Sequence, residues 1–221
     1  EYRRQRQMCI RDSHCVEQDA IMATADVLGE QRFSGFTDRI EHCAECPPEL
    51  VDLVGRCGAA VVTQPGFIYW NGPSYRDRVS KDLQPHLYPA GALHRAGVAV
   101  AFGSDAPVID PNPWPGIYSA ATRSAGDGRP LDDDGTSQAV DLESARRMYT
   151  LAGALAEGNA ADIGSIGPGK LADLVLVVTD PLAVGLERIK DVPNFWYDFS
   201  SAAYSDGCTV AFRKIRLKKL P

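Results

Sequence analysis

The stretch VAVAFGSDAP at residues 98–107 decides how this chain is interpreted. Its first half is apolar, rich in small and β-branched residues and followed by turn residues, which predicts a buried strand. The strand ends near Asp105, and Pro107 opposes its continuation. In barrel enzymes built from parallel strands, the reactive groups lie at the carboxyl ends of the strands. Asp105 is therefore a candidate functional residue, although a lone aspartate at such a position also serves as a turn former.

Three further strand ends precede this one, at His14, His42 and about Gln64. Helical patterns separate them, and this alternation predicts a parallel α/β fold. The four ends are 28, 22 and 41 residues apart, an average of about 30, close to the ~31 expected when ~250 residues form eight units. The spacing predicts four strand–helix units, which is half of a barrel. Helices are expected over residues 17–31, 48–57, 87–96, 116–124 and onward from Asp141, and an aromatic loop over 64–70.

The two ends of the chain differ from this middle part. Residues 1–13 show no periodicity and place charges where a buried strand is needed, so they are expected to be non-native or disordered. Residues 14–160 are expected to form the half barrel. A turn-rich GSIGPGK segment at 164–170 then opens an apolar strand at 171–178. No helical pattern is evident after residue 160, and residues 161–221 are predicted to form a small β module.

Composition narrows the possible partners and compartment. The 221 residues carry a net charge of -6 with 44% hydrophobic residues, which is typical of a globular protein and disfavours nucleic acid as a partner. We expect no membrane partner, since there is no apolar run of membrane-spanning length, and with no visible secretory signal we expect a cytoplasmic location. Six cysteines at this length favour free thiols over a disulfide framework. Cys43 and Cys46 form a C-x-x-C pair that suits a redox function or half of a zinc site.

Two histidines and a carboxylate, His14, His42 and Asp105, fall at the ends of three predicted neighbouring strands. Two imidazoles and a carboxylate are a workable ligand set for a divalent metal, with zinc expected, and leave a position open for water. The metal lowers the pKa of bound water from about 15.7 towards ~7. Asp105 is placed to act as the general base. Taken singly, each histidine is equally compatible with an ordinary hydrogen-bonded role.

Several motifs, in order along the chain, resemble the amidohydrolase superfamily. The nearest group is amidohydrolase 3, which includes YtcJ-like proteins and N-substituted formamide deformylases, and the resemblance covers roughly residues 14–182. The motifs that carry it are RIEH at 39–42, QP at 64–65, YP at 88–89, LHRAGV at 93–98, GSDAPV at 103–108 and GSIGPGKLADL at 164–174.

The resemblance implies a (β/α)8 TIM-like barrel followed by part of a small β-sandwich, and hydrolysis of carbon–nitrogen bonds other than peptide bonds. This chain corresponds to a C-terminal fragment with about strands 5–8. His14 then resembles the strand-5 metal ligand, His42 the strand-6 ligand, and Asp105 the strand-8 ligand and general base. Gln64 matches a position where a substrate contact is expected. The aromatic side chains Phe67 and Trp114 are expected in loops above the barrel mouth as substrate-binding walls.

This chain departs from the family pattern in several places, among them the bridging Lys or Glu near strand 4, which has no counterpart, and residues 195–203, which are unlike the family. VEQD at 16–19 stands where the family has Gly-Asp after the strand-5 histidine, and the strand-1 His-x-His pair has no counterpart. Three functions therefore stay open. The first is a metal-dependent hydrolase of a small-molecule amide or formamide. The second is a truncated, non-catalytic barrel half that acts as a binding or assembly module, whose exposed strand edges favour homo-oligomers. The third is a small zinc-binding interaction protein that uses His42, Cys43 and Cys46.

Overall fold

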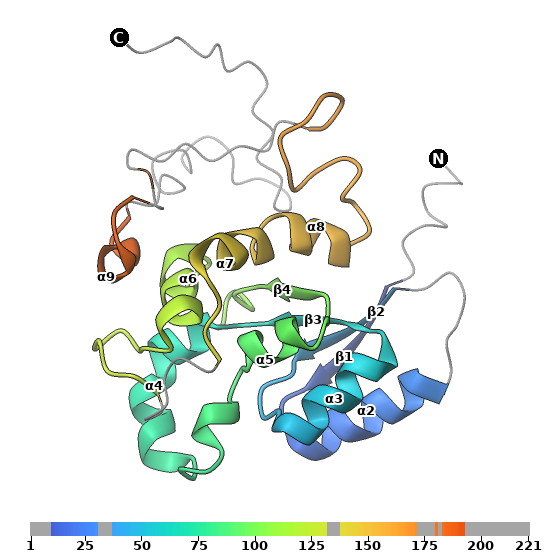
Figure 1. Ribbon diagram of the computed structural model, residues 1–221, viewed down its shortest axis with the longest axis horizontal. Helices are drawn as coiled ribbons and strands as arrows, with labels where there is room; N and C mark the ends of the chain where they lie inside the picture. The colour runs from blue at the N-terminus through green and yellow to red at the C-terminus, as the bar shows by residue number, and fades with distance from the viewer. Residues whose placement is uncertain (1–9, 31–36, 132–137, 172–179, 181–182, 193–221) are drawn as a thin grey trace.

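Four strands form one parallel sheet in the order β1-β2-β3-β4 (Figure 1). The computed structural model describes residues 10–30, 37–131, 138–171, 180 and 183–192. The strands are β1 (Ile10–Cys15), β2 (Thr37–His42), β3 (Ala60–Thr63) and β4 (Val100–Phe102). The helices are α2 (Gln18–Glu30), α3 (Pro48–Cys57), α4 (Gly66–Arg78), the 3-10 helix η1 (Gln84–His86), α5 (Ala90–Arg95), α6 (Pro113–Thr122), α7 (Leu142–Met148), α8 (Leu151–Ala156) and α9 (Leu186–Ile189).

All three strand pairings are parallel, so the carboxyl ends of the strands lie along the same edge of the sheet. In register, Cys15 of β1 lies opposite His42 of β2, and Thr63 of β3 lies opposite Phe102 of β4. Helices follow each of the first three strands. The α/β class with a parallel sheet, predicted from the alternation of patterns, is confirmed for the described residues.

Helices α2 and α3 lie side by side against the sheet (Figure 1). Helix α2 buries Ile21, Ala25 and Leu28, the three residues whose spacing predicts one helical face. Helix α3 begins at Pro48, where the missing N–H costs nothing, and is followed by Gly58 with a φ of +78°. Both ends of α3 agree with the sequence prediction.

Residues 10–13 belong to strand β1, whereas the sequence placed them outside the fold. The charges that argued against a strand are paired across it. Arg11 donates to Asp38 at 2.6 Å, and Arg39 donates to Asp12 at 2.6 Å. Each pair joins residues that lie opposite one another in the β1–β2 register. Charged side chains are accommodated here because this strand pair supplies the opposite charge at each position.

The aromatic stretch at 64–70, expected to be a loop, is largely helical. Helix α4 spans Gly66–Arg78 and contains both Gly72 and Pro73, residues that argue against a helix interior. Gly72 is needed for packing: a Cβ there would lie 2.4 Å from the Cβ of Ala125. Close approach of α4 to the turn after α6 therefore selects glycine at this position.

Two other predicted helices have different bounds. The helix expected over 87–96 is η1 followed by the short α5, and Leu87, Tyr88 and Pro89 separate the two. Tyr88 has a φ of +47°, which interrupts helical backbone. The helix expected over 116–124 is α6, which begins earlier, at Pro113, because the side chain of Asn112 caps it by accepting from the backbone N–H of Trp114.

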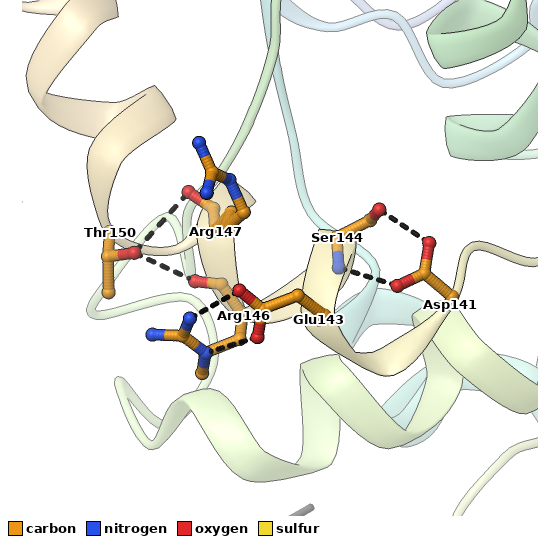
Figure 2. Close-up of polar contacts among 6 residues, drawn as sticks. All are labelled: Asp141, Glu143, Ser144, Arg146, Arg147 and Thr150. Atoms are coloured by element: carbon orange, nitrogen blue, oxygen red, sulfur yellow. Dashed lines mark hydrogen bonds and ion pairs between the residues drawn. The ribbon is translucent and has the colours of Figure 1, made fainter.

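Asp141 is the N-cap of α7, as predicted (Figure 2). Its carboxylate accepts from the backbone N–H of Ser144 at 2.9 Å and from the Ser144 hydroxyl at 2.5 Å. Arg146 pairs with Glu143 one turn earlier. The expected single long helix is interrupted at Thr150, whose φ and ψ of -121° and -92° are not helical and whose hydroxyl donates to the carbonyl of Arg146.

The described residues beyond 160 include the one-turn helix α9, where the sequence showed no helical pattern. The strand predicted at 171–178 lies, apart from Leu171, outside the described residues. Residues 179, 181–182 and 193–221 of the predicted β module also lie outside them. Over the part of the chain that the structure describes, no helix is long and apolar enough to cross a membrane.

Candidate active site

The three predicted metal ligands and Gln64 lie at or just beyond the carboxyl ends of the strands. His14 precedes the last residue of β1, and His42 is the last residue of β2. Gln64 follows β3 directly, and Asp105 lies three residues after β4. Because the strands are parallel, this edge is where side chains from different strands converge.

The two histidines form a close pair. The ring centroids of His14 and His42 are 4.4 Å apart, with the rings at 70° to each other. His42 is buried, and its φ of +71° is followed by a φ of +48° at Cys43. Two consecutive left-handed residues that are not glycine are costly and concentrate at functional sites. They turn the chain sharply after β2 and direct the His42 ring toward the neighbouring strand ends.

Gln64 and Phe67 hold the His42 ring from β3 and α4. The Nδ1 atom of His42 lies 2.9 Å from the Oε1 atom of Gln64. The ring of Phe67 stacks on His42 at 6.3 Å between centroids, with 13° between the planes. Gln64 is 2% exposed and Phe67 8%, so both contact the histidine from inside the protein.

Asp105 is exposed and has a φ of +54°. Within the ranges that the structure describes, no three His, Cys, Asp or Glu side chains are grouped closely enough to hold a metal ion. The structure thus brings the rings of His14 and His42 together, but among the described residues it does not group Asp105 with them as a set able to hold a metal. Two imidazoles at adjoining strand ends fit part of the donor set of a metal such as zinc. The described residues do not complete that set.

Trp114 is a core residue. It lies in the first turn of α6, is 8% exposed and packs in the hydrophobic cluster that includes Ile117 and Tyr118. The sequence placed it in a loop above the site because Pro111, Asn112 and Pro113 precede it. These residues start the helix that buries the indole instead.

The sequence did not predict a row of charged side chains, Asp12, Arg39 and Glu41, on one face of the β1–β2 pair. Arg39 lies 2.6 Å from Asp12 and 3.3 Å from Glu41. In register, His14 lies opposite Glu41, so this row runs up to the histidine pair. Burial raises the pKa of Glu41, an effect that Arg39 opposes and that Asp105 adds to. The period-two pattern of RIEH, with Ile40 fully buried on the other face, is the signal that could have revealed it.

Tyr88 is a second residue that the sequence analysis did not single out as functional. Its ring meets Phe67 edge to face at 5.7 Å, and its hydroxyl lies 3.1 Å from the hydroxyl of Tyr75. Its backbone N–H donates to the carbonyl of Ala44 at 2.7 Å. Burial raises the pKa of Tyr88 well above the ordinary range of a tyrosine. Tyr88 thus fixes the loop after β2 and supports Phe67 beneath His42.

The buried guanidinium of Arg123 holds the loop that carries Tyr88. Arg123 is 1% exposed, and its Nη1 atom donates to the carbonyls of Leu87 at 2.9 Å and Tyr88 at 3.4 Å. Its Nη2 atom donates to the carbonyls of Gln84 and Pro85, both at 3.4 Å. A cation buried against four carbonyl dipoles stabilises the segment that runs from η1 to Tyr88.

Cys43 and Cys46 are buried, free thiols. The hydrogen bond with Cys46, together with burial, raises the pKa of the Cys43 thiol. A buried thiol with a raised pKa is a poor nucleophile and a poor metal ligand. Since no three-residue group that could hold a metal occurs among the described side chains, the zinc site proposed for His42, Cys43 and Cys46 gains no support.

One open pocket lies at the opposite edge of the sheet. It has a volume of about 630 Å³ and is lined at the starts of the strands by Asp38, Ala60 and Val100, and by residues of α7 and α8 such as Met148 and Leu151. None of the predicted site residues lines it. The carboxyl edge remains the candidate site because the paired histidines and the strained backbone lie there.

Comparison with known proteins decides the family. A model of the amidohydrolase family, of the amidohydrolase 3 type, matches residues 6–210. The chain belongs to the amidohydrolase family. An N-substituted formamide deformylase from Arthrobacter pascens is 31% identical over 175 residues, which are 79% of this chain and 32% of that protein. The protein YtcJ of Bacillus subtilis is 29% identical over 157 residues, 68% of this chain and 28% of YtcJ.

A solved structure agrees with this assignment to the amidohydrolases. An uncharacterised metal-dependent hydrolase from Pyrococcus horikoshii has a TM-score of 0.68 and 26% identity, covering 80% of this chain and 35% of that one. The chain spans about a third of the length of the curated relatives it matches. The predicted resemblance to the amidohydrolase 3 group is confirmed.

Proposed function

We propose that the complete protein is a metal-dependent hydrolase that cleaves the carbon–nitrogen bond of a small amide or formamide. The observation that carries this proposal is the His14–His42 pair, whose ring centroids are 4.4 Å apart. The two residues lie at adjoining strand ends of a chain that belongs to the amidohydrolase family. The relative from Arthrobacter pascens, an N-substituted formamide deformylase, supports a formamide as the substrate class.

The same proposal explains why the described residues supply only part of a set of metal ligands. In it, β1 to β4 are the last four strands of an eight-stranded barrel, and the residues after 160 contribute to a small β-sandwich. A chain that spans about a third of its relatives then supplies only some of the ligands. His14 and His42 would hold a divalent metal, with zinc expected, together with donors from the rest of the protein.

The residues of this chain have distinct roles in the proposed reaction. A divalent metal bound there would lower the pKa of a water molecule towards neutrality. Asp105, exposed after β4, accepts the proton of the attacking water and delivers it to the leaving nitrogen. Its solvent-exposed position suits a group that must reach both water and substrate.

A non-catalytic barrel half is the second candidate function. The observation that favours it is that the side chains in the described ranges contain no three-residue group able to hold a metal. A chain of this kind would bind or assemble through its open sheet edges and would bind no zinc at His14 and His42.

Amine release from N-alkylformamides by the full-length protein tests the proposal. We expect Asp105→Asn to lower kcat by about 10²-fold or more, as for the loss of a general base, with an unchanged unfolding temperature. Asp26→Asn, an exposed carboxylate on α2, is the control and should keep full activity. A fully active Asp105→Asn protein would remove Asp105 from the mechanism, and a wild-type protein inactive on every amide and formamide tested would favour the second candidate.

A further inference from the structure

Gln64 has both ends of its side-chain amide engaged. The Nε2 atom donates to the backbone carbonyl of Val62 at 3.2 Å, and the Oε1 atom lies 2.9 Å from Nδ1 of His42. The residue is 2% exposed. The substrate contact predicted for Gln64 from the sequence therefore lacks an accessible group, and the amide faces the histidine.

These contacts determine where the proton lies on His42. The carbonyl of Val62 can only accept, so the amino group of the amide must be the end that faces it. The amide oxygen then faces Nδ1, and an amide oxygen can only accept. Nδ1 must therefore be the nitrogen that carries the hydrogen, and Nε2 is left with its lone pair free.

Three neighbours keep the ring in this orientation. Phe67 stacks on one face at 6.3 Å, and His14 meets it at 4.4 Å. Gln64 itself is held by the direction of β3, since Val62 lies only two residues earlier on the strand. Rotation of the amide to offer its amino group to His42 would place the amide oxygen against the Val62 carbonyl, where two acceptors would face each other.

We infer that Gln64 is a positioning residue that fixes His42 in the Nδ1-protonated tautomer and presents Nε2 as the free donor atom. The use of Nε2 as a metal ligand rests on the proposed function, because a ligating histidine donates its other N–H to a fixed acceptor. The tautomer itself does not rest on it, and it is measurable in the metal-free protein.

The test is two-bond ¹H–¹⁵N NMR on the full-length, histidine-labelled, metal-free protein, with the His42 signals assigned from their loss in His42→Ala. We expect His42 in the wild type to be protonated at Nδ1. Gln64→Met keeps the length of the side chain but removes the acceptor, and should transfer at least half of the population to the Nε2-protonated form. Gln64→Glu keeps an acceptor oxygen facing Nδ1 and should restore the wild-type tautomer.

The matched control is Gln84→Met. Gln84 is the other fully buried glutamine of the described chain, 1% exposed, and its amide donates to the carbonyl of Val79 at 2.8 Å, whereas the amide of Gln64 accepts from a histidine. This variant should leave the His42 tautomer unchanged. Circular dichroism identifies any variant that fails to fold, in which case the wild-type spectrum alone decides.

A zinc titration adds a second readout. Gln64→Met should bind Zn²⁺ about 10–100-fold more weakly than the wild type, the usual effect of losing such a partner. An Nε2-protonated His42 in the wild type, or an unchanged tautomer in Gln64→Met, would overturn the inference. A protein with the expected tautomers that hydrolyses no formamide would contradict only the proposed function.

Discussion

Replacement of Phe67 by alanine separates a substrate-binding role from a core role. The sequence placed Phe67 on an open pocket wall, but the side chain is 8% exposed and packs against Leu87, Tyr88 and Leu131 while stacking on His42. A buried phenylalanine replaced by alanine costs about 3–5 kcal/mol, because both transfer energy and contacts are lost. We therefore expect Phe67→Ala to lower the free energy of unfolding by that amount.

The assay is urea unfolding followed by far-ultraviolet circular dichroism. Trp70→Ala is the matched control, since Trp70 lies on the same helix, is 51% exposed and should change the free energy of unfolding by no more than about 0.5 kcal/mol. Phe67→Leu, which keeps an apolar side chain of similar bulk, should recover most of the loss. A Phe67→Ala protein within about 0.5 kcal/mol of the wild type would refute the core assignment and return Phe67 to the substrate wall.

Two further predictions concern helix ends and close packing. Asp141→Ala should lower the free energy of unfolding by about 1 kcal/mol, the usual cost of losing an N-cap, whereas Asp141→Asn should keep most of it. The hydrogen bonds from Ser144 lower the pKa of the Asp141 carboxyl below the unfolded value of about 3.9. The stabilisation by the Asp141 carboxylate is therefore complete above the unfolded pKa and is lost as the pH falls through the folded pKa. Urea unfolding at pH 7 and below pH 4 should show this loss in the wild type but not in Asp141→Asn. The same change in both proteins would contradict the cap. Gly91→Ala should be destabilised by about 1–3 kcal/mol through overpacking, because its Cβ would lie 2.8 Å from the backbone carbonyl oxygen of Ala139. Gly153→Ala, with open space around the new Cβ, should instead be neutral or gain stability, and equal unfolding temperatures for both variants would disprove the close contact.

Local sequence signals predicted the elements whose ends are marked by special residues. Pro48 and Gly58 bracket α3, Asp141 caps α7, and the β-branched run before Thr63 forms β3. In each case one or two residues have a conformational preference strong enough to act without distant partners. The parallel arrangement followed from the order of these elements.

The misassigned segments depend on contacts that are distant in sequence. The local sequence predicts a solvated Arg11, because its partner Asp38 lies 27 residues later in the chain. The low helix propensity of Gly72 predicts no helix there, and only its contact with the turn at Ala125 explains the glycine. The helix α4 has apolar residues on no single side, so its periodicity gave no signal. Tertiary contacts decide such segments, and local propensity does not show them.

In the candidate site, too, local signals predicted some residues, and contacts between distant residues decided the others. His14 and His42 were predicted from the ends of strands, and the structure brings their rings together. Gln64 was recognised from its motif but its partner was not, because sequence spacing does not show which way a side-chain amide faces. Trp114 was assigned to the site only because the residues before it resemble a loop.

Zinc binding by the full-length protein tests the central claim most directly. Metal content after equilibrium dialysis against Zn²⁺ would be compared among the wild type, His42→Ala and Cys46→Ser. The account predicts stoichiometric zinc in the wild type and in Cys46→Ser, and loss of that zinc in His42→Ala. Zinc retained in His42→Ala, or absent from the wild type, would contradict a metal centre at the paired histidines.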